Sequence, residues 1–150
     1  MSEQIATRAF RADDYDSAVQ LWRQSEGVEV AEGDDRGTIV RYLERNPNLS
    51  RVALRGDRVV GAVLCGHDGR RGLVYHLAVA DDERGQGIGR LLVDECLDGL
   101  RSSGIKRALI LVADDNDRGH VFWEGRGFVE ICGATPYGID LDSGGKSMPR

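Results

Sequence analysis

The chain has 150 residues, of which 41% are hydrophobic, and its formal net charge is −5 at pH 7. This length suits one domain with a single substantial core, which we place at residues 1–142, followed by a small, polar and flexible tail at 143–150. The negative charge argues against a nucleic-acid partner, because phosphate binding requires a basic patch. The first twenty residues lack the apolar segment of a signal peptide, and no uncharged run reaches membrane-spanning length. The sequence therefore predicts a cytoplasmic protein without a membrane partner.

Apolar periodicity in the first half of the chain predicts a strand, two helices and a hairpin. Strands show short runs rich in β-branched residues, whereas the helices show apolar stripes and have capping or stopping residues at their ends. The expected elements are a strand at residues 5–10, a helix capped by Asp13 or Asp14, a helix at 38–45 stopped by Asn46 and Pro47, and an antiparallel hairpin of 51–54 and 59–65.

The second half alternates strands and helices. A buried strand is expected first, and a helix whose apolar residues recur at helical spacing follows it. The expected elements are a strand at 73–79, a helix at 88–100 that ends before Gly104, a strand at 107–112, a short helix after Asn116 that carries Val121, Phe122 and Trp123, and a last strand at 137–141. This order predicts a mixed α/β (α+β) fold.

The three cysteines do not suggest a metal site or a disulfide. Cys65, Cys96 and Cys132 each lie in an apolar segment without the spacing of zinc ligands. We expect all three to be small buried hydrophobic residues.

The joint between the strand at 73–79 and the following helix is rich in glycine. Gly85, Gly87 and Gly89 alternate there, and without a Cβ their backbone N–H groups can turn together toward one oxyanion at the positive end of a helix. Arg84 and Arg90 add positive charge. The segment therefore predicts a diphosphate-binding loop.

Two common glycine loops do not fit this segment. A P-loop requires a lysine after its last glycine, and a dinucleotide-binding GxGxxG motif requires glycine at position 90. The chain has Arg90 there. Residues 84–89, with the sequence RGQGIG, instead match the pattern Q/R-x-x-G-x-G/A and resemble the pyrophosphate-binding motif of the GNAT N-acetyltransferase superfamily.

The flanking segments strengthen the resemblance to this family. Residues 123–128, WEGRGF, are similar to its Y-E-x-x-G-F ending, and residues 66–72, GHDGRRG, match a G-x-D-G-x-R-G hairpin. The chain most resembles small bacterial YpeA-type members related to the ribosomal-protein N-terminal alanine acetyltransferases. The resemblance implies a mostly antiparallel sheet of about six or seven strands, split between the fourth and fifth strands and flanked by about four helices.

The resemblance also implies acetyl-CoA as cosubstrate, without a metal. A backbone N–H at Leu77 is then expected to polarise the acetyl carbonyl, with Val79 pairing to the pantetheine and Asn116 holding the same arm while also capping the short helix. A fixed donor of this kind contributes about 3 kcal/mol in other enzymes. The residues expected to bind acetyl-CoA are Leu77, Ala78, Val79, Arg84, Gly85, Gln86, Gly87, Ile88, Gly89, Arg90 and Asn116.

The positions of the general base and the general acid depart from the family pattern. Leu111 stands where the alanine acetyltransferases have a glutamate as base, and Trp123 stands where they have a tyrosine as general acid. An indole donates a hydrogen bond but does not readily give up a proton. Tyr75 and Trp123 remain candidate catalytic side chains. Strand alternation predicts that Tyr75 and Leu77 share one face and that His76, which titrates in a useful range, points to the other.

The acceptor is expected to be a cationic primary amine. Five carboxylates within ten positions join the two N-terminal helices, in a loop that borders the acceptor groove in this family. Glu29, Glu32, Asp34 and Asp35 are the expected acceptor-binding residues. A missing base also favours amines of low pKa, such as a peptide N-terminus or a small polyamine.

Two other functions stay open. One is a CoA-binding module that has lost catalysis. The other is an enzyme that does not use CoA and whose glycines serve only to form the turn between the strand and the helix. Monomer and homodimer are also both compatible with the sequence.

Overall fold

The computed structural model describes residues 3–141, and the expected tail at 143–150 lies outside that range. Five strands form one sheet in chain order, with antiparallel pairing throughout except between the last two strands. They are β1 (Ile5–Ala9), β2 (Arg51–Arg55), β3 (Arg58–His67), β4 (Gly72–Val79) and β5 (Ala108–Leu109).

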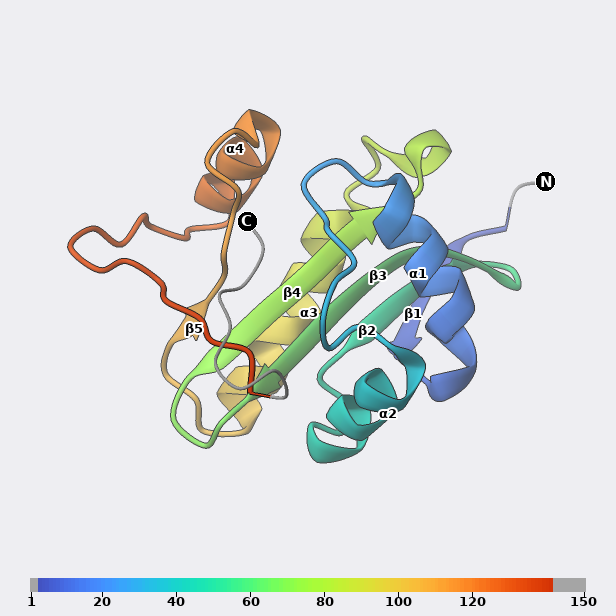
Figure 1. The fold of residues 1–150 in the computed structure, drawn as a ribbon. Coiled ribbons are helices and arrows are strands. Elements are labelled where there is room, and N and C mark those ends of the chain that lie inside the picture. Colours follow the sequence, from blue (N-terminus) through green and yellow to red (C-terminus); the bar gives the residue numbers. More distant parts are fainter. Residues whose placement is uncertain (1–2, 142–150) are drawn as a thin grey trace.

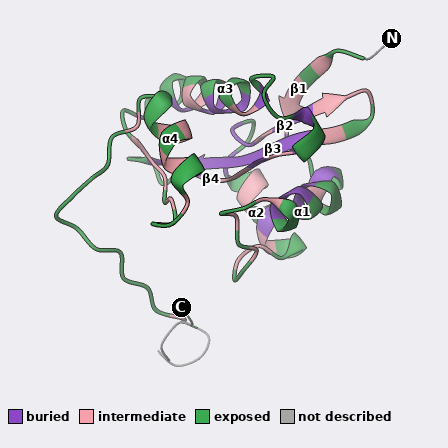
Figure 2. Cartoon of the chain, turned by 90° about the horizontal axis from the view of Figure 1, so that it is seen from above, coloured by how far each residue is buried: buried purple, intermediate pink, exposed green. Residues whose placement is uncertain are grey.

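Four α-helices flank this sheet (Figure 1). They are α1 (Tyr15–Gln24), α2 (Arg36–Arg45), α3 (Ile88–Ser102) and α4 (Asp117–Gly125), with short 3-10 turns η1 (Ala12–Asp14) and η2 (Asp81–Glu83). Helix α3 covers one face, and α1 and α2 cover the other (Figures 1 and 2). The predicted mixed, mostly antiparallel sheet with four helices is confirmed.

The core lies between the sheet and the helices on its two faces. Strand β3 is buried over most of its length (Figure 2), because it is the central strand and apolar side chains fill both of its faces. Trp22 on α1 and Leu92 on α3 are fully buried. Core formation on both faces fixes β4 in position, and β4 carries the site described below.

The sheet is split where β5 leaves β4. Only Gly72–Ala108 and Leu73–Leu109 pair, in parallel, and Gly72 N donates to Arg107 O at 2.8 Å. Beyond these pairs, the chain from Ile110 onward diverges from β4. The outer edge of β4 from Val74 to Val79 therefore has no strand beside it.

Two strand predictions in this region are wrong. The strand expected at 107–112 is two residues long, because its continuation turns away at the split. The strand expected at 137–141 does not form: these residues pair with no strand, and Tyr137 is 96% exposed. Five strands are therefore present in the described chain, instead of six or seven.

The three cysteines differ in burial. Cys65 and Cys96 are buried as expected. Cys132 is exposed because residues 129–139 stand away from the core, so the prediction that it is buried is wrong.

Within residues 3–141, no helix is long and apolar enough to cross a membrane.

Candidate active site

A cavity of about 760 Å³ lies at the split between β4 and β5. The walls come from β4, the glycine loop, the chain after β5, α4 and the loop between α1 and α2. The predicted cofactor and catalytic residues mostly meet here: those on the wall are Tyr75, Leu77, Val79, Arg84, Gly85, Gly87, Ile88, Gly89, Arg90, Asn116 and Trp123.

The glycine loop is shaped by two left-handed residues. Gly85 and Gly87 have φ values of 79° and 81°, and an added Cβ at either would meet no atom within 4 Å. Gly87 is the N-cap of α3, and Leu91 N donates to Gly87 O at 2.9 Å. The N–H groups of residues 88–90 are therefore first-turn groups without helical partners, which is the arrangement that binds anions.

A network of hydrogen bonds holds this loop against the β2–β3 hairpin. Arg55 donates to both oxygens of Glu83, at 2.6 and 2.8 Å, and to Gln86 Oε1 at 2.9 Å. Gln86 Nε2 in turn donates to Glu83 at 2.8 Å. These bonds from Arg55 hold the pKa of Glu83 below its ordinary value, so this carboxylate is ionised and its charge is balanced by Arg55 beside the glycine loop.

Strand β4 contains a β-bulge at the middle of the cavity. Leu64 pairs with Tyr75 and Ala62 pairs with Ala78, so His76 and Leu77 together lie opposite a single β3 residue. His76 has a φ of 53°, a left-handed conformation that is uncommon for residues other than glycine.

The bulge overturns the predicted alternation of side chains. The rings of Tyr75 and His76 are 6.5 Å apart and lie on the same face as Trp22, whose ring is 5.0 Å from that of His76. Leu77 lies on the α3 side instead, near Gly89. Tyr75 and His76 therefore share a face, and Leu77 has the opposite one.

The backbone of β4 presents free polar groups to the split. Ala80 N donates to Val60 O on β3 at 2.8 Å, and successive amides of a strand alternate in direction. The N–H and C=O of Val79 consequently face away from β3, toward the split.

His76 is held by a carboxylate from the loop between α1 and α2. Its Nε2 lies 2.8 Å from Asp34 Oδ2, and the two side chains are 19% and 12% exposed. Asp34 Oδ2 also accepts from Ala31 N, and Tyr15 donates its hydroxyl to Asp34 O. The pair is thus fixed from both sides, and its histidine lines the cavity.

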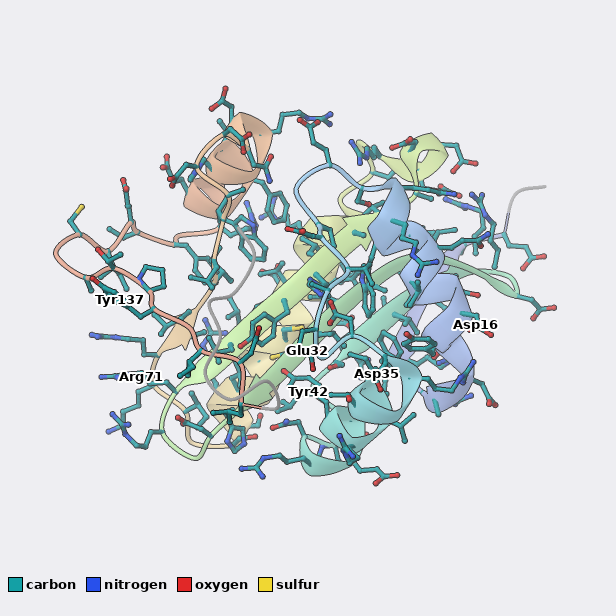
Figure 3. The ribbon with its side chains drawn as sticks, viewed as in Figure 1. Asp16, Glu32, Asp35, Tyr42, Arg71 and Tyr137 are labelled. Carbon is teal, nitrogen blue, oxygen red and sulfur yellow. The ribbon has the colours of Figure 1, made fainter. Side chains whose placement is uncertain are left out.

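The acidic loop contributes less to the cavity than expected. Asp34 bonds to His76, and Asp35 caps α2 by accepting from Thr38 N at 3.1 Å. Figure 3 shows Glu32 and Asp35 on the loop and helix in front of the sheet, but Glu32 does not line the cavity. Glu26 and Glu29 do line it.

The short helix α4 closes the cavity opposite this loop. Asn116 caps it by accepting from Gly119 N at 3.0 Å, as predicted. The loop approaches so closely here that a Cβ added to Gly27 would overlap the Asn116 side chain. Asn116 therefore lines the cavity where α4 meets the loop between α1 and α2.

The departures from the family pattern persist in the structure. Leu111 lines the cavity and is 77% exposed. Trp123 packs edge-on against Phe122 and Phe128, with ring centroids 5.1 Å apart in each pair. Burial raises the pKa of Tyr75, so its hydroxyl remains protonated at neutral pH.

Within the described part of the chain, no group of three or more His, Cys, Asp or Glu side chains is arranged to hold a metal ion. The sequence did not predict two features of the site, the hydrogen bond between His76 and Asp34 and the ion pair between Arg55 and Glu83. Their partners are 42 and 28 residues apart, and no local motif links them.

Comparison with known proteins gives a consistent family. A model of the Acetyltransferase (GNAT) family matches residues 6–128. An acetyltransferase of Pectobacterium atrosepticum is 34% identical over 110 residues, which are 73% of this chain and 77% of that protein. An acetyltransferase of Sodalis glossinidius has the same identity and coverage.

Solved structures share the fold at lower identity. Ard1 from Thermoplasma volcanium has a TM-score of 0.74 and 23% identity, covering 83% of this chain and 82% of its own. A chain of the NatC complex, solved with Gag peptide and CoA, has a TM-score of 0.71 and 20% identity, with coverages of 85% and 86%. Rv2747 from Mycobacterium tuberculosis, solved with CoA and NLQ, gives 0.69 and 24%, with coverages of 88% and 76%.

Proposed function

This chain belongs to the acetyltransferase (GNAT) family, and from that premise we propose that it transfers an acetyl group from acetyl-CoA to the primary amine of a cationic acceptor. The observation that carries the proposal is one cavity that joins a phosphate-binding loop to the free backbone edge of β4. The acceptor would be a peptide N-terminus or a small polyamine.

The residues around the cavity suit acetyl-CoA. The first-turn N–H groups of α3, with Arg84 and Arg90 beside them, would hold the diphosphate. The N–H and C=O of Val79 would pair with the pantetheine amides, and Asn116 would contact the same arm. Acetyl-CoA supplies the activated acyl group, and the N–H of Leu77 would stabilise the developing oxyanion, a contribution of about 3 kcal/mol elsewhere.

Several features support an amine acceptor. Glu26 and Glu29 line the cavity and would attract a cation. Neighbouring folds include Ard1 and a NatC complex solved with a peptide. The Tyr75 hydroxyl remains protonated and lies on the wall, where it could give a proton to the leaving thiolate or orient the amine.

A CoA-binding protein without catalysis is the second candidate. The observation in its favour is Leu111, an exposed aliphatic side chain where related enzymes carry a base. Binding of acetyl-CoA without thiol release on a broad panel of amines would support this candidate and contradict the enzyme.

A glycine substitution tests the cofactor site. Gly87→Glu adds bulk and negative charge at the diphosphate position, and we expect calorimetry to show loss of acetyl-CoA binding. Gly104→Glu is the matched control, because Gly104 has a similar φ of 80° at the far end of α3 and no atom within 4 Å of an added Cβ. Unchanged affinity in a folded Gly87→Glu protein would refute the site.

A further inference from the structure

We propose that His76 is the general base of the reaction and that Asp34 is its positioning residue. This inference rests on the proposed acetyl transfer and names the group that removes the proton from the acceptor amine. It gives a role to the pair that is formed across the cavity wall by β4 and the loop between α1 and α2.

The first argument is the backbone of His76. A regular strand would direct this side chain to the face opposite Tyr75, and the bulge places both rings on one face instead. A left-handed φ of 53° is unfavourable for a residue with a Cβ, so the surrounding contacts must hold it. Residues held in this way cluster at functional sites.

The second argument is the hydrogen bonding of the ring. Because Nε2 faces the Asp34 carboxylate, Nε2 carries the proton and Nδ1 carries the lone pair. Within residues 3–141, Nδ1 has no hydrogen-bond partner and is not fully buried. His76 lines the cavity and its side chain is 19% exposed, so Nδ1 is the ring nitrogen left to accept a proton there.

The third argument is the support around the pair. Trp22 is fully buried behind the imidazole, and Asp34 is fixed by Ala31 N. A carboxylate that holds the tautomer of an imidazole and stabilises its protonated form is the arrangement by which a histidine becomes an effective base. Leu111 leaves the usual base position without a titratable side chain, whereas His76 lies on the same cavity wall.

The reaction moves one proton from the acceptor to His76 and the acetyl group from sulfur to nitrogen. The acceptor ammonium gives one proton to Nδ1 of His76, which becomes an imidazolium paired with Asp34. The freed amine lone pair forms the C–N bond to the acetyl carbon, and the C–S bond breaks with its electrons passing to sulfur. The amine gives up its second proton to the leaving thiolate, with Tyr75 as the hydroxyl that can relay it, and the imidazolium returns its proton to solvent.

Other titratable or charged groups must be separated from His76 in any pH profile. Those that line the same cavity are Glu26, Glu29, Tyr75, Glu83, Arg84, Arg90 and Arg118. Asp34, Tyr42 and Tyr15 do not line it but contact His76, Tyr75 and Asp34 respectively. Tyr42 stays neutral, because burial raises its pKa far above the ordinary value.

Four variants test the proposal. His76→Gln keeps a donor toward Asp34 but cannot accept a proton, and His76→Gly removes the ring while suiting the left-handed backbone. Asp34→Asn removes the charge behind the imidazole. The matched control is His67→Gln, at a histidine on the β3–β4 turn whose Nδ1 accepts from Gly69 N, away from the cavity.

Thiol release from acetyl-CoA is followed with spermidine and with a basic peptide that has a free N-terminus. We expect His76→Gln to lower kcat/KM at pH 7 about a hundredfold, and Asp34→Asn about tenfold, while calorimetric affinity for acetyl-CoA stays unchanged. The wild-type rate should level off near neutral pH, where imidazoles lose their proton. The His76→Gln rate should instead keep rising toward pH 9, and added imidazole should partly restore His76→Gly.

A second readout does not depend on turnover. Long-range ¹⁵N NMR of the protein should show the neutral His76 ring as the Nε2–H tautomer, and Asp34→Asn should reduce the preference for that tautomer. A wild type that is active and is matched by its His76 variants in rate and pH profile would overturn the base assignment alone. A wild type that binds acetyl-CoA and turns over no amine would overturn the proposed function itself.

Discussion

Aromatic residues of α4 decide how one wall of the cavity is built. Trp123 is held edge-on between Phe122 and Phe128, and it also packs against the core. Its contacts are those of a packing residue. The indole N–H can donate a hydrogen bond but cannot transfer a proton at neutral pH.

We therefore expect Trp123→Phe to keep kcat within about tenfold of wild type, below the usual contribution of a general acid. The measurement is steady-state thiol release at saturating acetyl-CoA, with Tyr75→Phe compared at the same protein concentration. A thousandfold loss of kcat in folded Trp123→Phe, with KM intact, would show that the indole acts in the transition state.

The left-handed backbone of the two loop glycines could be predicted from the sequence, whereas that of His76 could not. Gly85 and Gly87 reveal left-handed backbone from sequence, because glycine is the residue that adopts it freely. His76 gives no such signal within an apolar strand. Its conformation follows from one extra residue in β4 relative to β3, a register that only the folded sheet defines.

At the scale of elements, the β2–β3 hairpin contacts the turn before the glycine loop through two arginines that differ in exposure. Arg55 makes a bidentate ion pair with Glu83 of η2, and Arg58 makes one with Asp82 of the same turn. The Arg55 side chain is 23% exposed and its partner Glu83 is 8% exposed, whereas Arg58 is 56% exposed. Only the first pair is shielded enough to contribute appreciably.

Arg55→Met should weaken acetyl-CoA binding about tenfold, equivalent to about 1.4 kcal/mol. The loop loses its brace, and Glu83 is left as an uncompensated charge beside the diphosphate. Arg58→Met, a matched control on the same hairpin, should change the affinity little because exposed ion pairs contribute little. Equal calorimetric affinities for the two variants would contradict the bracing role.

Helices and the long strands were predictable because apolar periodicity and caps are local. The length of strand β5 was not predictable. Residues 107–112 have the composition of a strand, but only two of them pair with β4, because the chain leaves β4 at the split. The segment at 137–141 alternates suitably and pairs with nothing. Whether such a run becomes a strand depends on a free edge beside it, which sequence does not state.

At the scale of the whole molecule, stability in acid depends on carboxylates that are ionised and hydrogen-bonded in the folded state. Asp14 is buried, accepts from both Arg8 guanidinium nitrogens at 2.7 and 2.9 Å, and accepts from Arg11 N at 2.8 Å. Burial raises the pKa of Asp14, but these hydrogen bonds outweigh it, and its net pKa is lowered. The stabilisation is therefore present above the unfolded-state pKa and is lost as pH falls through the folded-state pKa.

We expect the free energy of unfolding to fall between pH 5 and pH 3, measured by urea denaturation. Asp14→Asn should lower it by about 2 kcal/mol at pH 7 and flatten this pH dependence. Asp16→Asn, two residues further along in α1, is the control: its pair with Arg36 is exposed, so a change below about 0.5 kcal/mol is expected. An Asp14→Asn protein with wild-type acid sensitivity would exclude this pair as the source.

Charged residues of both signs line the cavity. Arg84 and Arg90 lie at the glycine loop and the first turn of α3, where Glu83 is paired with Arg55. Glu26 and Glu29 lie on the loop between α1 and α2, and Arg118 lies on α4. An anionic cosubstrate and a cationic acceptor would thus each meet residues of opposite charge. The net charge of −5 favours the same class of acceptor.

Removing the two glutamates of the loop between α1 and α2 tests this attraction. The double variant Glu26→Gln with Glu29→Gln should raise KM for spermidine or a basic peptide about tenfold and leave kcat nearly unchanged, because attraction on approach is lost while the reacting groups stay. The wild-type KM should rise with salt, and that dependence should shrink in the variant. Glu32→Gln is the control, since Glu32 is an exposed carboxylate of the same loop that does not line the cavity. Equal KM values for the control and the double variant, or a preference for anionic acceptors, would show that this loop does not select the substrate.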